Sequence, residues 1–168
     1  MYLNVHSQYS LRYGTMSIEN LIEEASARGI TQMVITDINN STGVMEFMRE
    51  CRKNKIKPIG GLEFRRDKRL LYIGIAKNKE GMKELNDFLS EHNLKQKELP
   101  DESRVFEHAY VVYPYGYKVK LKSNEYIGIR FDELYQLYNK DLTDYQDKLL
   151  VLQPVFVANK IGYRLHEY

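Results

Sequence analysis

Short apolar runs alternate with amphipathic stretches along the first half of the chain. Apolar residues recur at helical spacing in 17–29, 43–54 and 80–89, which predicts three helices. Ser17 is a typical N-cap and Gly29 is typical of a helix end, so the first helix is bounded on both sides. Continuous apolar runs predict buried strands at 1–5, at 30–36, from 57 onward and at 69–76.

These elements follow one another as strand, helix, strand, helix, strand, strand, helix. Such an order is typical of the α/β class, in which crossover helices join parallel strands. An open, doubly wound sheet and a closed barrel both fit it. The pattern alone therefore predicts the class and leaves the two architectures open.

The chain becomes more polar after its first half. Region 91–104 is rich in charge and contains Pro100, which indicates a linker. Beyond it, Lys118, Lys120 and Lys122 alternate with Val and Leu, and this alternation predicts a half-exposed strand. The same three lysines are candidates for contacts with the phosphates of a nucleic acid.

Further elements are expected around this basic stretch, namely strands at 110–113 and 125–129, a helix at 131–139 and a last strand at 149–157. In the helix, Leu134, Leu137 and Tyr138 are expected to face inward. Proline has no amide hydrogen to donate to a neighbouring strand. Pro154 therefore predicts that the last strand ends at Gln153 or lies at the edge of the sheet.

Composition narrows the class of protein. The chain has 168 residues, of which 43% are hydrophobic and 29% charged, and this is typical of a single globular domain covering 1–168. A net charge of +2 is too small to indicate a nucleic-acid-binding protein by itself. Cys51 is the only cysteine, and neither a signal peptide nor an apolar run long enough to span a membrane is present, so we expect a cytoplasmic protein.

Three polar residues directly follow apolar runs, and they are His6, Asp37 and Glu63. Each is expected at the carboxyl end of a buried strand, where parallel β/α folds carry their functional groups. Imidazole and carboxylate groups are common ligands of divalent cations. The pattern therefore predicts one site to which all three residues contribute.

Five segments occur in an order and spacing typical of one family, and they are HSQYSL at 6–11, ITD at 35–37, GVMEF at 43–47, IKPIGGLE at 56–63 and AKNKEG at 76–81. Together they resemble the polymerase and histidinol phosphatase (PHP) family, in the form found at the N-terminus of the alpha subunit of bacterial DNA polymerase III. Several linked motifs in register are more specific than one short pattern. The resemblance is close over 1–81 and weaker afterwards.

This resemblance implies a distorted, seven-stranded β/α barrel with up to three metal ions at the carboxyl ends of its strands. Family members with an intact site hydrolyse phosphoesters, and in some polymerases they remove misincorporated nucleotides. Paired cations lower the pKa of a bridging water and neutralise the charge that develops on the phosphoryl oxygens. The mechanism therefore depends on the number of ligands that remain.

Several ligand positions of the family hold other residues in this sequence. Asn4 stands in place of the first of two histidines, and Ile38 stands in place of the histidine of the Thr-Asp-His motif. Tyr13 replaces an acidic residue, and Leu71 replaces the histidine of the fourth strand. The later ligand positions fall on Tyr115, Pro154 and Phe156.

Only His6, Asp37 and Glu63 remain, with Glu63 at the position of the family's bridging carboxylate. So few ligands cannot hold a cluster, and we expect neither a bound cofactor nor a catalytic residue. In a buried pocket these side chains can satisfy one another by hydrogen bonding. The alternative is a single Zn²⁺, Mn²⁺ or Mg²⁺ bound by His6 and Glu63, with water completing its shell.

The resemblance implies a role in DNA replication as the N-terminal piece of a longer DNA-directed DNA polymerase, a nucleotidyltransferase. Its expected partners are the polymerase core of the same chain, and further a proofreading exonuclease or DNA. Polymerisation itself is not expected here, because the carboxylates that bind the catalytic metals belong to another segment of such enzymes. Two alternatives stay open: a phosphoesterase or 3′–5′ exonuclease with a reduced site, and a DNA- or protein-binding module.

Overall fold

A computed structural model describes residues 2–117, 120–138 and 147–155 of the chain. The elements of the first part are β1 (Asn4–Val5), α1 (Ile18–Ala27), β2 (Gln32–Ile35), α2 (Val44–Lys53), β3 (Lys57–Arg66), β4 (Arg69–Ala76) and α3 (Lys79–Leu94). Those of the second part are β5 (Ala109–Pro114), β6 (Glu125–Ile129), the 3₁₀ helix η1 (Phe131–Leu137), β7 (Leu149–Val151) and β8 (Pro154–Val155). The predicted α/β class is confirmed.

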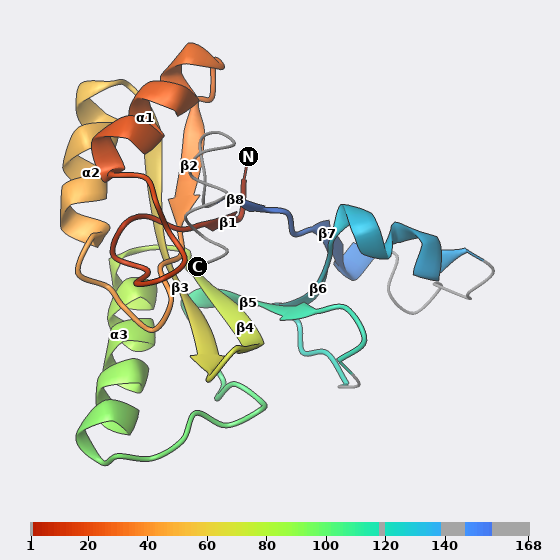
Figure 1. The fold of residues 1–168 in the computed structure, drawn as a ribbon. Helices are drawn as coiled ribbons and strands as arrows, with labels where there is room; N and C mark the ends of the chain where they lie inside the picture. Colours follow the sequence, from red (N-terminus) through yellow and green to blue (C-terminus); the bar gives the residue numbers. More distant parts are fainter. Residues whose placement is uncertain (1, 118–119, 139–146, 156–168) are drawn as a thin grey trace.

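Six strands form one curled sheet in the order β2-β3-β4-β5-β6-β7, and β1 pairs with β8 in a second, two-stranded sheet. The amide of Thr36 donates to the carbonyl of Val5 at 2.8 Å, which places β1 beside the end of β2. Helices α1, α2 and α3 all lie along one side of the strands, and η1 lies at the far end beside β7 (Figure 1). The sheet thus curls around the side that carries no helix.

The expectation that crossover helices join parallel strands holds for β2 and β3 and fails for β4 and β5. The β2–β3, β5–β6 and β6–β7 pairs are parallel, whereas β4 runs antiparallel to both β3 and β5. Only Asp67 and Lys68 separate β3 from β4. A connection of two residues allows a hairpin but cannot carry the chain back across the sheet, so β4 must run antiparallel to β3.

The hydrophobic core is divided by the sheet. One cluster lies between α3 and the β3–β4–β5 strands and includes Phe64, Leu71 and Phe88. A second lies beneath α1 and α2. A third and smaller cluster joins β2, β4 and β5 to Leu152, which follows β7. Burial on both faces explains why β2 and β4 read as continuous apolar runs in the sequence.

The ends of the first helix follow the predicted capping. Ser17 is the N-cap of α1, and its hydroxyl accepts a hydrogen bond from the amide of Asn20 at 3.2 Å. Gly29 follows the helix with a φ of +66°, a left-handed conformation that glycine adopts at low cost. These local signals were sufficient because capping involves only residues close in sequence.

The predicted linker begins later than expected. Helix α3 extends to Leu94, so its last turn occupies the start of 91–104. There the ammonium of Lys95 pairs with Glu91 at 2.7 Å, and the ring of His92 packs on Phe88. A polar composition is typical of a linker and equally of a solvent-exposed helix end, so composition alone misplaced the boundary.

Three expectations for the second half also change. Lys120 and Lys122 lie in an irregular segment rather than a strand, and Lys118 lies outside the described residues. The expected helix at 131–139 is the shorter 3₁₀ helix η1, in which Leu134 is 43% exposed instead of facing inward. Tyr138 follows η1 and is 82% exposed. The sequence pattern indicates an apolar face but does not show whether another element covers it.

The last expected strand is divided at its proline. β7 ends at Val151, and Pro154 begins β8, where it pairs in register with Asn4. The interruption before Pro154 agrees with the sequence, whereas the partner of β8 could not be read from it. Among the described residues, no helix is both long enough and apolar enough to cross a membrane.

Candidate functional site

His6 and Glu63 lie against each other inside the fold. His6 directly follows β1, where its amide donates to the carbonyl of Val155 at 2.8 Å. Glu63 lies within β3, and its amide donates to the carbonyl of Asp37 at 3.2 Å. The two side chains meet with Nε2 of His6 2.9 Å from Oε2 of Glu63, and both are almost completely buried. The expectation that Glu63 ends its strand is wrong, because β3 continues to Arg66.

Arg65 completes this pair. Its Nε donates to Oε1 of Glu63, the carboxylate oxygen that His6 leaves unused. Residues two apart on a strand project to the same face, which is why Arg65 can reach back to Glu63. Asn39 fixes the backbone of Arg65, because its side chain donates to the Arg65 carbonyl at 2.8 Å and accepts from the Arg65 amide at 2.9 Å.

Tyr13 covers the outer side of the same group. The guanidinium of Arg65 lies over the Tyr13 ring at 4.2 Å, and the ring of His6 meets Tyr13 edge to face at 6.4 Å. A cation over an aromatic face is attracted to it, most strongly where water is excluded. Tyr13 therefore helps to hold the guanidinium of Arg65 in place. By the family resemblance, the position of Tyr13 itself corresponds to an acidic residue.

The ionisation of Glu63 follows from these contacts. Burial by itself raises the pKa of this carboxyl group, because it disfavours the charged form. The hydrogen bond and charge of His6, together with the charge and hydrogen bond of Arg65, outweigh burial, and the pKa of Glu63 is lowered overall. Glu63 is therefore an ionised carboxylate near neutral pH, held between two cationic or potentially cationic side chains.

Asp37 is bound in a different way. It follows β2, and its Oδ1 accepts from the amide of Ser7 at 2.7 Å and from the hydroxyl of Ser10 at 2.6 Å. Its Oδ2 accepts from the hydroxyl of Ser7 at 2.8 Å. Three donors to one buried carboxylate make strong, charge-assisted hydrogen bonds. Asp37 therefore anchors the loop that follows His6.

The structure places the replaced ligand positions as follows. The amide oxygen of Asn4 accepts from the hydroxyl of Thr36 at 3.2 Å, so this buried residue has a structural partner. Ile38 is half-buried and pairs in parallel with Glu63 through its backbone. Leu71 belongs to the core cluster beneath α3. None of these three side chains can coordinate a cation strongly.

The later positions lie in two different regions. Pro154 pairs in register with Asn4, so this late segment reaches the first motif, as the resemblance implies. Tyr115 follows β5, where its hydroxyl contacts the carbonyl of Gln136 at 3.5 Å. Phe156 lies outside the described residues. The convergence of β1 and β8 could not be derived from periodicity, since it joins segments 150 residues apart in the register Asn4 to Pro154.

The side-chain atoms of this pocket that could bind a metal do not fit a metal cluster. Oε1 of Glu63 accepts from a guanidinium, Oε2 accepts from His6, and both oxygens of Asp37 accept from the neighbouring serines. Among the described residues, the ring nitrogen Nδ1 of His6 is the one atom of this pocket that is buried without a hydrogen-bond partner. Within the same residues, no group of three His, Cys, Asp or Glu side chains is arranged to hold a metal ion.

Sequence reasoning missed Arg65, Ser7 and Ser10 as members of this site. The signal for Arg65 was its position two residues after Glu63 on a strand, which places both on one face. The signal for the serines was their position in the loop that follows a strand end. The first signal also indicates the partner, because Glu63 lies on the same strand. The second does not, because Asp37, the partner of the serines, follows a different strand.

The basic stretch contributes no part of this pocket. The ammonium of Lys122 pairs with Oε1 of Glu125 at 3.2 Å, and its amide donates to Oε2 of the same residue at 2.7 Å. Lys120 is exposed to solvent. One of the two described lysines therefore has its charge balanced locally, which weakens the case for a continuous strip that binds phosphates.

The chain is similar to known proteins over about half of its length. The chain is 40% identical to the DNA polymerase III subunit alpha of Ureaplasma parvum over 79 residues, which are 47% of this chain and 8% of that protein. It is 33% identical to the DNA polymerase III subunit alpha of Chlamydia trachomatis over 90 residues, 54% of this chain and 7% of that protein. The matched part thus spans less than a tenth of these relatives.

A solved structure of an amidohydrolase from Chromobacterium violaceum, with bound sulfate and no metal, aligns with a TM-score of 0.44 and 22% identity. The alignment covers 56% of this chain and 34% of that chain. The sequence profile of the PHP domain matches residues 3–163, which is nearly the whole chain. The chain therefore belongs to the PHP family.

Proposed function

We propose that this chain is the PHP domain of a replicative DNA polymerase alpha subunit whose hydrolytic metal site has decayed, leaving a structural role. The observation that carries the proposal is the ion pair between Arg65 and Glu63. Glu63 stands where the family's bridging carboxylate stands, and its charge is balanced by a guanidinium. A guanidinium supplies positive charge but has no coordination site at which a water could be activated.

The surrounding replacements support the same conclusion. Asn4, Ile38 and Leu71 each have a packing or hydrogen-bonding role, and none supplies an imidazole. Hydrolysis in this family depends on clustered ligands that keep two cations close together. The one free imidazole nitrogen among the described residues of the pocket is too few ligands for that chemistry, which supports the proposal.

The structural role is proposed from the relatives. The relatives from Ureaplasma parvum and Chlamydia trachomatis are named DNA polymerase III subunit alpha, and this chain corresponds to a small part of their length. We infer that the domain packs against a polymerase core, which would then carry out nucleotide addition. A proofreading exonuclease and DNA are further contacts that such an assembly would bring close.

Metal analysis tests the decayed site most directly. Protein purified without chelator is expected to contain substoichiometric Zn, Mn and Mg and to leave bis-p-nitrophenyl phosphate and single-stranded DNA unhydrolysed when these ions are added. Glu63→Gln serves as the reference for background turnover. One or more tightly bound ions per chain, or turnover that Glu63→Gln abolishes, would contradict the proposal.

The structural role needs a separate test. A polymerase core expressed as its own chain is expected to bind this domain in size-exclusion chromatography, and the complex is expected to form in the presence of EDTA. Failure of the two chains to associate would remove the scaffolding part of the proposal. The outcome is independent of the metal analysis.

A second candidate function rests on one atom. Nδ1 of His6 is buried without a hydrogen-bond partner among the described residues, and a neutral imidazole nitrogen is a good ligand for Zn²⁺ or Mn²⁺. Nδ1 points away from Glu63, which bonds Nε2, so His6 and Glu63 would share one cation only after their hydrogen bond opens. Such a reduced site would then act as a phosphoesterase or 3′–5′ exonuclease. Arg65 must leave Glu63 before this carboxylate can bind a cation. On this second candidate function, Arg65→Ala is therefore expected to raise phosphoesterase activity.

A further inference from the structure

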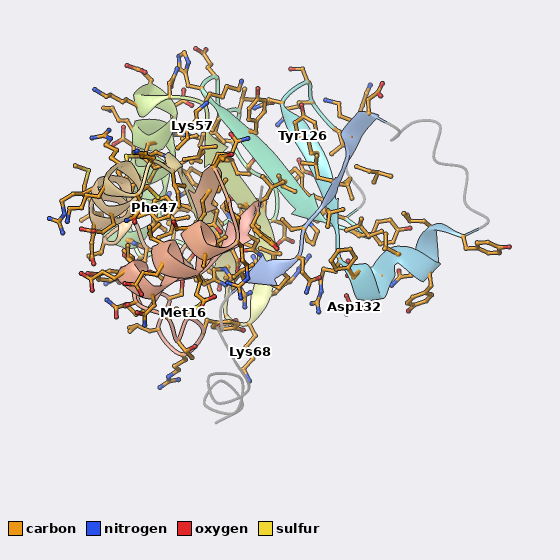
Figure 2. The ribbon with its side chains drawn as sticks, turned by 90° about the horizontal axis from the view of Figure 1, so that it is seen from above. Met16, Phe47, Lys57, Lys68, Tyr126 and Asp132 are labelled. Carbon is orange, nitrogen blue, oxygen red and sulfur yellow. The ribbon has the colours of Figure 1, made fainter. Side chains whose placement is uncertain are left out.

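A large groove lies at the end of the sheet away from His6 and Glu63. It has a volume of about 1260 Å³ and is lined by α2, α3, the start of β3 and the ends of β4, β5 and β6 that meet there. Lys57, at the start of β3, and Tyr126, in β6, lie on one side of the molecule, and Lys68 in the β3–β4 turn lies on the opposite side (Figure 2). The groove is therefore distinct from the pocket of Glu63.

The floor of the groove is apolar and rich in methionine. Met45 and Met48 come from α2 and Met82 comes from α3. Met48 and Met82 meet above Gly60, where a Cβ atom would lie 2.8 Å from the sulfur of Met82. Met45 is 77% exposed. Unbranched, polarisable methionine side chains can adapt to differently shaped apolar partners, and such surfaces are common at binding grooves.

The rim of the groove carries one sign of charge. Its charged residues are Arg52, Lys57, Lys77, Lys79 and Lys83, and no Asp or Glu lines it among the described residues. Lys83 pairs with Asp87 at 2.5 Å, whereas Arg52, Lys57 and Lys79 make no ion pair within the described part of the chain. Five cations around one groove contrast with a net charge of only +2 for the whole chain.

We propose that this groove binds an acidic amphipathic helix of a partner protein. The helix would lie between α2 and α3 with its apolar face on Met45, Met48 and Met82, and its carboxylates would face the basic rim. Helix-in-groove recognition uses apolar anchors spaced at i, i+3, i+4 and i+7. Complementary charge at the rim adds specificity and speeds association.

The chemistry of the groove favours a peptide over a nucleic acid. The two tyrosines of the groove, Tyr110 and Tyr126, meet edge to face, and each has a lysine over its ring, from Lys77 and Lys148 at 4.7 Å. One face of each ring is therefore covered by a lysine, which reduces the aromatic surface left for stacking with the bases of a single-stranded nucleic acid. A methionine floor also offers nothing to the polar edges of bases.

Fluorescence anisotropy with a labelled peptide tests the proposal. The peptide has about 15 residues, with Leu at i, i+3, i+4 and i+7 and Glu on the remaining face. The peptide is expected to bind the full chain, and its affinity is expected to fall as the salt concentration is raised. Lys57→Glu and Lys79→Glu are each expected to weaken binding by about fivefold, because a rim charge is reversed. Lys68→Glu makes the same charge change at the opposite end of β3 and is the matched control.

The apolar floor is tested in parallel. Met45→Ser is expected to weaken binding by a factor similar to that of the charge reversals. Leu94→Ser removes a comparably exposed side chain, 85% exposed at the end of α3, and is expected to have no effect. Both positions are exposed, so neither change should disturb folding, and circular dichroism verifies this.

Three results would overturn the proposal. A scrambled peptide of the same composition that binds equally well would show attraction by charge alone. A single-stranded oligonucleotide that binds more tightly than the peptide, with loss in Lys57→Glu, would assign the groove to nucleic acid. A dimer in sedimentation that Met45→Ser dissociates would assign it to a second copy of this chain.

Discussion

Nε2 of His6 lies 2.9 Å from Oε2 of Glu63, although 57 positions separate the two residues in the sequence. This contact joins the end of β1 to the middle of β3 in a place that excludes water. Arg65 occupies the second oxygen of the same carboxylate. The three side chains form a buried charge network, and its properties lead to several measurable expectations.

Removing Arg65 should destabilise the fold. Its side chain is only 13% exposed, and its loss leaves the carboxylate of Glu63 with a single partner. We expect Arg65→Met to lower the free energy of unfolding by about 3 kcal/mol, as measured by urea denaturation, since an unbalanced buried charge is costly. The exposed Arg69→Met should have little effect, and equal losses from both variants would contradict this account.

Neutralising the carboxylate of Glu63 should recover part of the stability that Arg65→Met loses. In the double variant Glu63→Gln with Arg65→Met, no unbalanced charge remains in the pocket, so its stability is expected to exceed that of Arg65→Met alone. The same urea experiment measures both proteins. A double variant less stable than the single one would mean that Glu63 has another partner.

Glu63 should also make stability depend on pH in the acid range. Its pKa is lowered in the folded state, so its contribution is complete above the ordinary value of 4.5 and is lost as the pH falls through the lower folded value. We expect the free energy of unfolding to fall less steeply below about pH 5 in Glu63→Gln than in the parent protein. Urea titrations at several pH values measure this slope, and identical slopes would refute the assignment.

Asp37 should hold the loop that follows β1. In Asp37→Asn, an amide group that donates hydrogen bonds replaces one oxygen that accepts them from Ser7 or Ser10. The expected loss is about 2 kcal/mol in the free energy of unfolding. Trypsin should also cleave faster after Arg12, an exposed residue of this loop. Asp67→Asn, at an exposed turn position, is the control.

Cys51 should be unreactive in the native protein. Its thiol is completely buried, and burial raises its pKa to about 12, so almost no thiolate forms at neutral pH. We expect Ellman's reagent to label no thiol in buffer and one thiol per chain in concentrated urea. Full labelling of the native protein would show that α2 opens readily.

Local signals in the sequence predicted much of the fold. The strands Arg69–Ala76 and Glu125–Ile129 have the bounds expected from their apolar runs, and α1 begins after Ser17 as its cap predicts. The expected helix at 131–139 failed because an amphipathic pattern needs another element to cover its apolar face, and no residue of η1 is buried by the described part of the chain. Signals that act within one turn or one strand were therefore reliable, and those that require a distant partner were not.

The sequence likewise predicted some residues of the candidate site and not others. His6 and Glu63 were expected in one place because each follows or belongs to an apolar run, and the structure brings them into contact. Arg65 was not foreseen, although it lies two residues after Glu63 on the same strand. Its burial depends on contacts with the Tyr13 ring and with Asn39, which belong to distant segments and leave no local signal.

The sequence alone determined that an amide and two aliphatic side chains stand at 4, 38 and 71, because the chemistry of a side chain does not depend on folding. Only the tertiary structure decided which charge meets the carboxylate of Glu63, namely the guanidinium of Arg65, two positions further along β3. It also decided that β8 lies beside β1. Strand pairing and burial are set by contacts between distant segments, and these determine which charges meet.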